Sequence, residues 1–188
     1  MRDISLHLMD IVQNSIKASA TKIVIRIFAD KDLDKMRIEI EDNGQGMDDE
    51  LLIQVKNPFV TTRTTRKVGL GLPLLDASAN RAGGGLSVKS EKGKGTIIQA
   101  VFQISHIDRI PLGDVSETMM TLIAANPEID FQLVLCNMEK SFDFSLSEIR
   151  AQIGEISVDQ IEILMWIKEY INEGVIEIFG GVLSEIYS

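Results

Sequence analysis

The sequence is poor in the residues that build disulfides and histidine metal centres. Among 188 residues it has one cysteine, Cys136, and two histidines, His7 and His106, which stand far apart in the chain. A single cysteine cannot form an internal disulfide. Because Cys136 ends an apolar run that begins at Phe131, we interpret it as a small buried hydrophobic residue. Metal chemistry that depends on histidine is therefore not expected.

Long apolar runs are also lacking. No stretch of eighteen apolar residues is present, and the first residues contain no apolar segment of the length that a secretory signal needs. These absences favour a cytoplasmic protein without a membrane span. With 45% hydrophobic and 25% charged residues, the chain is long enough for one sizeable core.

Positive charge is scarce in one part of the chain only. Residues 1–104 carry 15 Lys and Arg against 13 Asp and Glu, whereas residues 105–188 carry 4 against 15. A nearly neutral first part can approach a polyanionic small molecule through a few placed cations, while the acidic second part should repel nucleic acid. We therefore expect no nucleic-acid partner, and an electropositive protein partner remains open.

Hydrophobic spacing predicts a two-layer α+β sandwich, with a mainly antiparallel sheet and helices on one face. The first 104 residues are expected to hold helices at 3–20, 48–56 and 72–82 and strands at 22–28, 35–41, 86–90 and 96–103. The Thr/Arg-rich segment 57–69 lacks periodicity and is expected to be a functional loop. After a linker at 105–113, a small, acidic, mainly helical extension at 114–188 should hold helices at 114–125, 145–153 and 157–173 and a strand at 129–136.

Two short segments combine glycine with turn chemistry at the ends of expected elements. Asp42-Asn43-Gly44-Gln45-Gly46-Met47 follows a strand, and Gly69-Leu70-Gly71-Leu72 precedes a helix. A carboxylate can accept a hydrogen bond from the exocyclic amine of adenine, and glycines let the backbone approach the ring. Backbone N–H groups at a helix start can receive phosphates. Each segment alone also fits an ordinary turn.

The first expected helix places three polar side chains on one side. Asp10, Asn14 and Lys17 are spaced about one turn apart. An amide oxygen suits Mg²⁺, an ammonium group suits a phosphate, and a carboxylate can orient a nucleophile. The alternative interpretation is a solvated polar stripe, which is common on amphipathic helices.

Together and in order, these segments resemble the motifs of the gyrase/chaperone/histidine-kinase/mismatch-repair (GHKL) ATPase superfamily, whose shared module is the Bergerat fold. Residues 10–17 are similar to its asparagine box, residues 42–47 to its first glycine box, and residues 68–73 to its second. Gly93-Lys94-Gly95-Thr96 is similar to its closing Gly-x-Gly-Thr motif. The resemblance covers roughly residues 5–104 and is greatest to histidine-kinase catalytic domains.

The resemblance implies that the chain binds ATP with Mg²⁺, and it implies roles for single residues. Asn14 would hold Mg²⁺ through the phosphates, Lys17 would contact a phosphate, Asp42 would bind adenine, and Thr96 would support the adenine contact. Residues 60–68 would form a lid over the nucleotide. The other implied contacts are Gly44, Gly46, Arg63, Gly69, Leu70, Gly71 and Leu72.

Two departures from the family pattern leave the activity open. ATP-hydrolysing branches place a glutamate where this chain has Asp10, so a role for Asp10 as general base is uncertain. Histidine kinases carry the phosphorylated histidine on a hairpin before this module, and here the module is expected to begin at residue 3, so we expect any kinase activity to act on another chain. His7 lies on the first expected helix, where we expect it to be buried.

Three functions fit these residues. The first is a stand-alone signalling kinase, histidine- or serine-type, that phosphorylates a partner protein in trans. The second is an ATP-gated switch or weak ATPase that regulates a partner, and the third is a non-enzymatic adaptor that works through its C-terminal helices. The helix around Trp166 should pack on the rest of the chain or on a second subunit, so a homodimer is possible.

Overall fold

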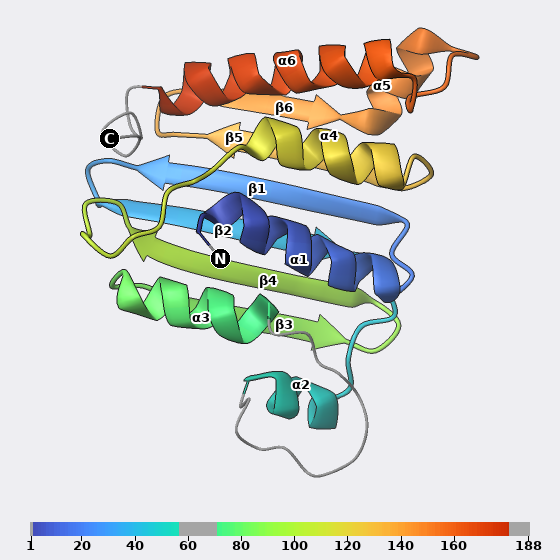
Figure 1. Cartoon of the computed structure of the whole chain (residues 1–188). Helices are drawn as coiled ribbons and strands as arrows, with labels where there is room; N and C mark the ends of the chain where they lie inside the picture. Colours follow the sequence, from blue (N-terminus) through green and yellow to red (C-terminus); the bar gives the residue numbers. More distant parts are fainter. Residues whose placement is uncertain (1, 57–70, 181–188) are drawn as a thin grey trace.

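The computed structural model describes residues 2–56 and 71–180, in which six strands form one sheet of order β3-β4-β2-β1-β5-β6. The strands are β1 (Lys22–Asp30), β2 (Lys35–Asp42), β3 (Gly85–Glu91), β4 (Gly95–Gln103), β5 (Asp130–Cys136) and β6 (Ser141–Ser145). The helices are α1 (Ile4–Lys17), α2 (Asp49–Lys56), α3 (Gly71–Arg81), α4 (Val115–Ala125), α5 (Leu146–Ile153) and α6 (Ile161–Phe179). Helices α1, α3, α4 and α6 cover one face of the sheet (Figure 1). The mainly antiparallel two-layer arrangement confirms the predicted fold class.

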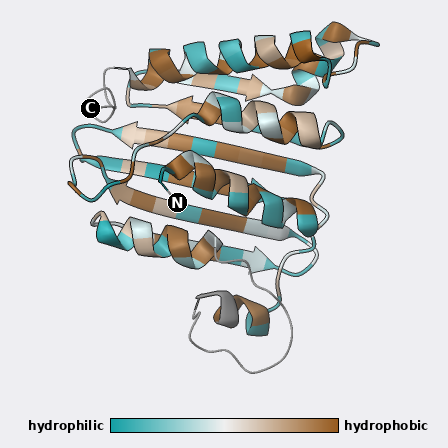
Figure 2. Cartoon of the chain, in the orientation of Figure 1, coloured by the Kyte–Doolittle hydropathy of each residue, from teal (hydrophilic) through white to brown (hydrophobic). Residues whose placement is uncertain are grey.

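Strict alternation in β1 and β2 decides which side chains enter the core. Ile25 and Ile27 of β1 pair with Ile40 and Ile38 of β2, and all four are buried under the helices. The intervening positions face away from the helices, where Arg26 forms ion pairs with two glutamates of β2. A period of two thus separates a dry face from a solvated one. Figure 2 shows the hydrophobic residues along these strands.

Helix α1 is shorter than the predicted span of 3–20. Asp3 caps its start, because the Asp3 carboxylate accepts a hydrogen bond from the Leu6 N–H at 3.0 Å. The helix ends at Lys17 because Ser19 adopts a left-handed conformation with φ of 60°, which a continuing helix excludes. The chain then turns directly into β1.

The sheet continues across the boundary that the charge distribution suggested near residue 105. Strand β5 pairs in parallel with β1, and α4 packs against both α1 and α6. The segment 105–113 is attached to the first helix, since Pro111 and Leu112 accept backbone hydrogen bonds from Ile4 and Ser5 at 2.9 Å. The division into residues 1–104, 105–113 and 114–188 stays a prediction about folding units.

The C-terminal elements depart from expectation at two places. Helix α6 runs to Phe179, beyond the predicted end at 173, because Gly174, Ile178 and Phe179 continue its buried side. It begins at Ile161 because residues 157–160 form a turn. Strand β6 was not predicted: it spans five residues, too few for alternation to be distinguished from a loop.

Two expectations from the composition can be compared with the structure: the lack of a membrane span and the burial of Cys136. No helix in the described ranges is long and apolar enough to cross a membrane. Cys136 is only partly buried, because it points to the side of β5 opposite the buried Leu135, which corrects the expectation of a fully buried residue. Partial burial nevertheless raises the pKa of the Cys136 thiol.

Candidate functional site

A row of polar side chains crosses three strands at one end of the sheet. Asp42 of β2 is the register partner of Thr96 of β4, and Thr96 is the partner of Ser90 of β3. Each occupies a position on the helix-covered face, where the other inward residues of its strand are apolar. The C-terminal end of α1 and the β3–β4 turn lie at the same end of the sheet (Figure 1), and the start of α3 lies beside Asp10 in the middle of α1. The sheet therefore presents polar groups beside the end of α1 and the β3–β4 turn.

Asp42 is the most enclosed of these groups, with 6% of its surface exposed. Its Oδ2 accepts a hydrogen bond from the Ser15 hydroxyl at 2.7 Å, and its Oδ1 accepts one from the Gly44 N–H at 2.9 Å. An ionised carboxylate has about four acceptor positions, so two donors leave capacity for a further donor. Helix α1 and the glycine loop thus orient a buried acceptor that can bind an amino group of a ligand.

The loop after Asp42 requires glycine at both predicted positions. A Cβ at Gly44 would lie 2.8 Å from the Ala18 carbonyl oxygen, and one at Gly46 would lie 2.0 Å from that of Glu91. Gly46 also has φ of +62°, a conformation that other residues rarely adopt. The loop is therefore clamped between the end of α1 and the β3–β4 turn, with no room for side chains at these two positions.

Ser90 is a residue of this site that the sequence reasoning missed. Its hydroxyl donates to the Gly95 carbonyl at 2.9 Å, accepts from the Met47 N–H at 2.8 Å, and lies 2.9 Å from the Thr96 hydroxyl. A hydroxyl has one proton, so Thr96 must be the donor in the last contact. Ser90 thereby joins the glycine loop to the start of β4. Its inward polar position at the end of an alternating strand was the available signal.

The three polar residues of α1 lie beside this row. Asn14 is half-buried, and Asp10 and Lys17 are exposed. Within the described ranges, their side chains form no hydrogen bond or ion pair, so they are available to a ligand. A Cβ at Gly71, the buried first residue of α3, would lie 3.2 Å from the Cβ of Asp10. The second glycine segment therefore begins directly against the polar side of α1.

Several predicted contacts play other parts or cannot be placed. Leu72 is the second residue of α3, and its side chain is buried in the core. Arg63, Gly69, Leu70 and the predicted lid at 60–68 lie outside the described residues.

His7 is buried on α1, as expected, with 1% exposure and with its Nε2 3.4 Å from the Ser78 hydroxyl. Desolvation by burial, followed by the positive N-terminus, lowers the pKa of His7.

Known proteins match the first part of this chain. Residues 2–106 match the family described as histidine kinase-, DNA gyrase B-, and HSP90-like ATPase. Sporulation kinase C of Bacillus subtilis is 33% identical over 96 residues, which cover 51% of this chain and 22% of that protein. Sensor protein kinase FleS of Pseudomonas aeruginosa is 32% identical over 109 residues, which cover 58% and 26%. The chain thus spans about a quarter of the length of these two relatives.

Solved structures give weaker likenesses. The ATPase domain of Aquifex aeolicus MutL, complexed with ADP, has a TM-score of 0.42 at 17% identity and covers 81% of this chain and 68% of its own. The N-terminal domain of a DNA repair protein has a TM-score of 0.48 at 19% identity, covering 77% and 53%. Both scores are below 0.5, so nothing about function follows from them. Because the family match alone covers more than half of the sequence, the chain belongs to the histidine kinase-, DNA gyrase B- and HSP90-like ATPase family and carries an ATP-binding domain of the histidine-kinase-like type.

Proposed function

We propose that the polar site around Asp42, at the end of α1, forms a pocket that binds ATP with Mg²⁺ and that the protein transfers the γ-phosphoryl group to a partner protein. The observation that carries this proposal is Asp42, a buried carboxylate with two fixed donors and remaining acceptor capacity. The adenine amino group fits that acceptor. Gly44 and Gly46 let the loop pack closely against the end of α1 and the β3–β4 turn, and the Gly44 N–H holds the Asp42 carboxylate in place.

The polar side of α1 forms the phosphate end of the proposed pocket. Asn14 would hold Mg²⁺ through its amide oxygen, and Lys17 would neutralise phosphate charge. Bound Mg²⁺ would supply further neutralisation of the triphosphate. The described ranges contain no group of three His, Cys, Asp or Glu side chains that could hold a metal ion, so the phosphates would supply much of its coordination. Gly71 would offer its N–H at the start of α3, and Thr96 would support the adenine contact.

Phosphoryl transfer would break the bond between the γ-phosphorus and the β–γ bridging oxygen, with ADP as the leaving group. A bond would form to a side-chain oxygen or nitrogen of the partner, whose proton must pass to a base. Asp10 is the candidate base, since it is exposed beside Gly71 and its side chain forms no hydrogen bond or ion pair among the described residues. Arg63 and the predicted lid would cover the phosphates. Most of the rate would come from positioning and charge neutralisation.

The adenine assignment is tested by Asp42→Asn in isothermal titration calorimetry with ATP and Mg²⁺. A hydrogen bond to a charged acceptor contributes about 1.5–3 kcal/mol, so affinity should fall about 10- to 150-fold. The matched control is Asp30→Asn. Asp30 is also a buried aspartate, 4% exposed, but its carboxylate accepts from the Leu33 N–H at the opposite end of β1. Unchanged affinity in Asp42→Asn would show that the pocket is wrongly assigned.

The fate of the γ-phosphoryl group separates the kinase from its alternatives. The full chain is incubated with γ-labelled ATP, Mg²⁺ and a cell lysate, and the label is followed. Label on a protein supports the kinase, and release of inorganic phosphate supports the weak ATPase. If neither outcome is observed while ATP binding is intact, the result supports the ATP-gated switch. The non-enzymatic adaptor requires, in addition, that partner binding be independent of ATP.

A further inference from the structure

The outer face of α6 carries apolar side chains that the fold leaves uncovered. Ile161, Met165, Trp166 and Ile176 are 61%, 45%, 47% and 62% exposed. The opposite side of the helix is buried against the sheet and α4. Single exposed apolar residues are ordinary on a protein surface, whereas four on one face of one helix form a patch. Figure 2 shows hydrophobic and hydrophilic residues mixed along this helix.

Acidic side chains lie among these apolar residues. Glu162, Glu169 and Glu173 are exposed on the same face, and no ion pair within the described ranges involves them. Glu169 and Glu173 are four residues apart, a spacing at which like charges destabilise a helix. Lys168, the basic residue of α6, is already paired with Glu117 of α4. The fold therefore keeps an unneutralised acidic ridge beside exposed apolar surface.

A cleft continues the apolar surface toward α4. It has a volume of about 310 Å³ and lies between the start of α4 and the C-terminal half of α6. Val115, Val175, Ile176 and Phe179 supply apolar lining, and Asp114 adds an acidic edge. A cleft of this kind can receive one apolar side chain of a partner, the usual anchor when a helix binds in a groove.

We propose that the outer face of α6 and this cleft dock a basic amphipathic helix of a partner protein. Apolar residues of that helix contact Met165, Trp166 and Ile176, and its Lys or Arg side chains neutralise Glu169 and Glu173. Charge argues against a second copy of this chain, because a two-fold interface would place the acidic ridge against itself. It also argues against nucleic acid, whose phosphates the ridge repels.

The docking surface is separate from the nucleotide pocket. Helix α6 covers β5 and β6, while the pocket lies over β2 and β4. Since neighbouring strands are about 4.8 Å apart, roughly 14 Å of sheet separates β2 from β6. A docked partner therefore leaves the pocket open. Docking at this surface does not depend on ATP binding, so the two can be tested independently.

Trp166 is the only tryptophan of the chain, and its indole stacks on Tyr170 with ring centroids 5.4 Å apart. Its fluorescence therefore reports directly on the outer face of α6. The probe is a synthetic amphipathic helix built from Leu and Lys, without aromatic residues, titrated into the full chain. Binding should shift the Trp166 emission to shorter wavelength. A Leu/Glu version of the peptide, and a scrambled Leu/Lys version that is not amphipathic, should bind at least about tenfold more weakly.

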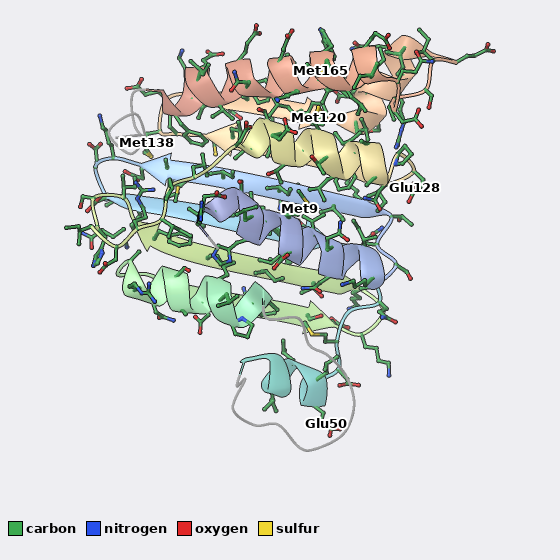
Figure 3. The ribbon with its side chains drawn as sticks, viewed as in Figure 1. Met9, Glu50, Met120, Glu128, Met138 and Met165 are labelled. Carbon is green, nitrogen blue, oxygen red and sulfur yellow. The ribbon has the colours of Figure 1, made fainter. Side chains whose placement is uncertain are left out.

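The decisive variant is Glu169→Lys/Glu173→Lys, which should weaken peptide binding roughly tenfold or more. The matched control, Glu50→Lys/Glu128→Lys, changes the net charge equally at exposed positions that Figure 3 shows away from Met165 of α6. It should alter affinity by less than about threefold. Equal weakening in both double variants would overturn the proposal, since binding would then follow net charge alone. Equal binding of the scrambled peptide would also overturn it.

Two other occupants of the surface give distinct results. If sedimentation equilibrium shows a dimer whose dissociation by dilution shifts Trp166 emission, the occupant is a second copy and the proposal fails. The full-length variant Leu183→Ser/Ile186→Ser tests the chain's own C-terminal segment, which follows Gly180 at the edge of the cleft. A changed Trp166 emission in that variant without peptide would assign the surface to that segment and would likewise overturn the proposal.

Discussion

Replacing Ser90 by alanine should loosen the nucleotide pocket while the sheet stays intact. The Ser90 hydroxyl is the common partner of the Met47 N–H, the Gly95 carbonyl and the Thr96 hydroxyl. Alanine leaves all three groups without this partner. Because the hydroxyl is only half-buried, water can satisfy part of the loss, and we expect the free energy of unfolding to fall by about 1–2 kcal/mol.

The effect on stability is measured by urea unfolding and by the thermal midpoint. For a chain of this size, each kcal/mol lowers Tm by about 2–4 °C, so Ser90→Ala should lower it by about 2–8 °C. The control is Ser87→Ala on the same strand. Ser87 is exposed on the face away from the helices, with no side-chain hydrogen bond among the described residues. Its substitution should change stability by less than about 0.5 kcal/mol.

The effect on function is measured by ATP calorimetry on the same two variants. Ser90 fixes Met47, which ends the loop that begins at Asp42, so its loss should reduce ATP affinity several-fold. Ser87→Ala should bind ATP as the unmodified chain does. An equal loss of stability in the two variants would contradict this prediction. So would a destabilised Ser90→Ala that still binds ATP with unchanged affinity. The second result would separate the hydroxyl from the pocket.

Two further substitutions test the loop and the buried histidine. Gly46→Ala places a Cβ 2.0 Å from the Glu91 carbonyl oxygen and should lower the free energy of unfolding in urea by several kcal/mol. The control is Gly93→Ala, where φ is +80° and nothing lies within 4 Å of a Cβ. Backbone strain alone should lower its free energy of unfolding by about 1 kcal/mol. Because the pKa of His7 is lowered in the folded state, its protonation favours unfolding: stability should be full above the ordinary pKa of about 6.5 and fall below it. His7→Gln should flatten this dependence between pH 8 and pH 5, and an unchanged slope would assign it to other groups.

Local patterning was sufficient to predict five of the six strands, but not the short β6. Alternation placed the strand now seen as β2, and the Asp42 segment at its end was recognised as a possible ligand site. Chemistry that depends on distant residues was harder to find. The Ser15 hydroxyl reaches a carboxylate 27 positions away, and Met47 reaches Ser90 across 43 positions. Serine is common in any sequence, so only its inward position on an alternating strand distinguishes Ser90.

Pairing between distant strands could not be predicted from the sequence for the same reason. Nothing in residues 130–136 alone specifies that they lie in parallel beside residues 22–28. The change in charge near residue 105 is real, but it marks a difference in surface chemistry. The sheet itself continues through β5, so composition and architecture divide this chain at different places.

The continuous sheet gives the two proposed surfaces a physical connection. Helix α1 carries Asn14 and Lys17 on one side, and it packs on α4, which in turn packs on α6. Strand β1, which follows α1, is hydrogen-bonded along its length to β5. Any shift of α1 that accompanies nucleotide binding must therefore displace α4 as well, since packed cores deform little. If the outer face of α6 responds to ATP, Trp166 emission should change on nucleotide addition, and Asp42→Asn should abolish that change.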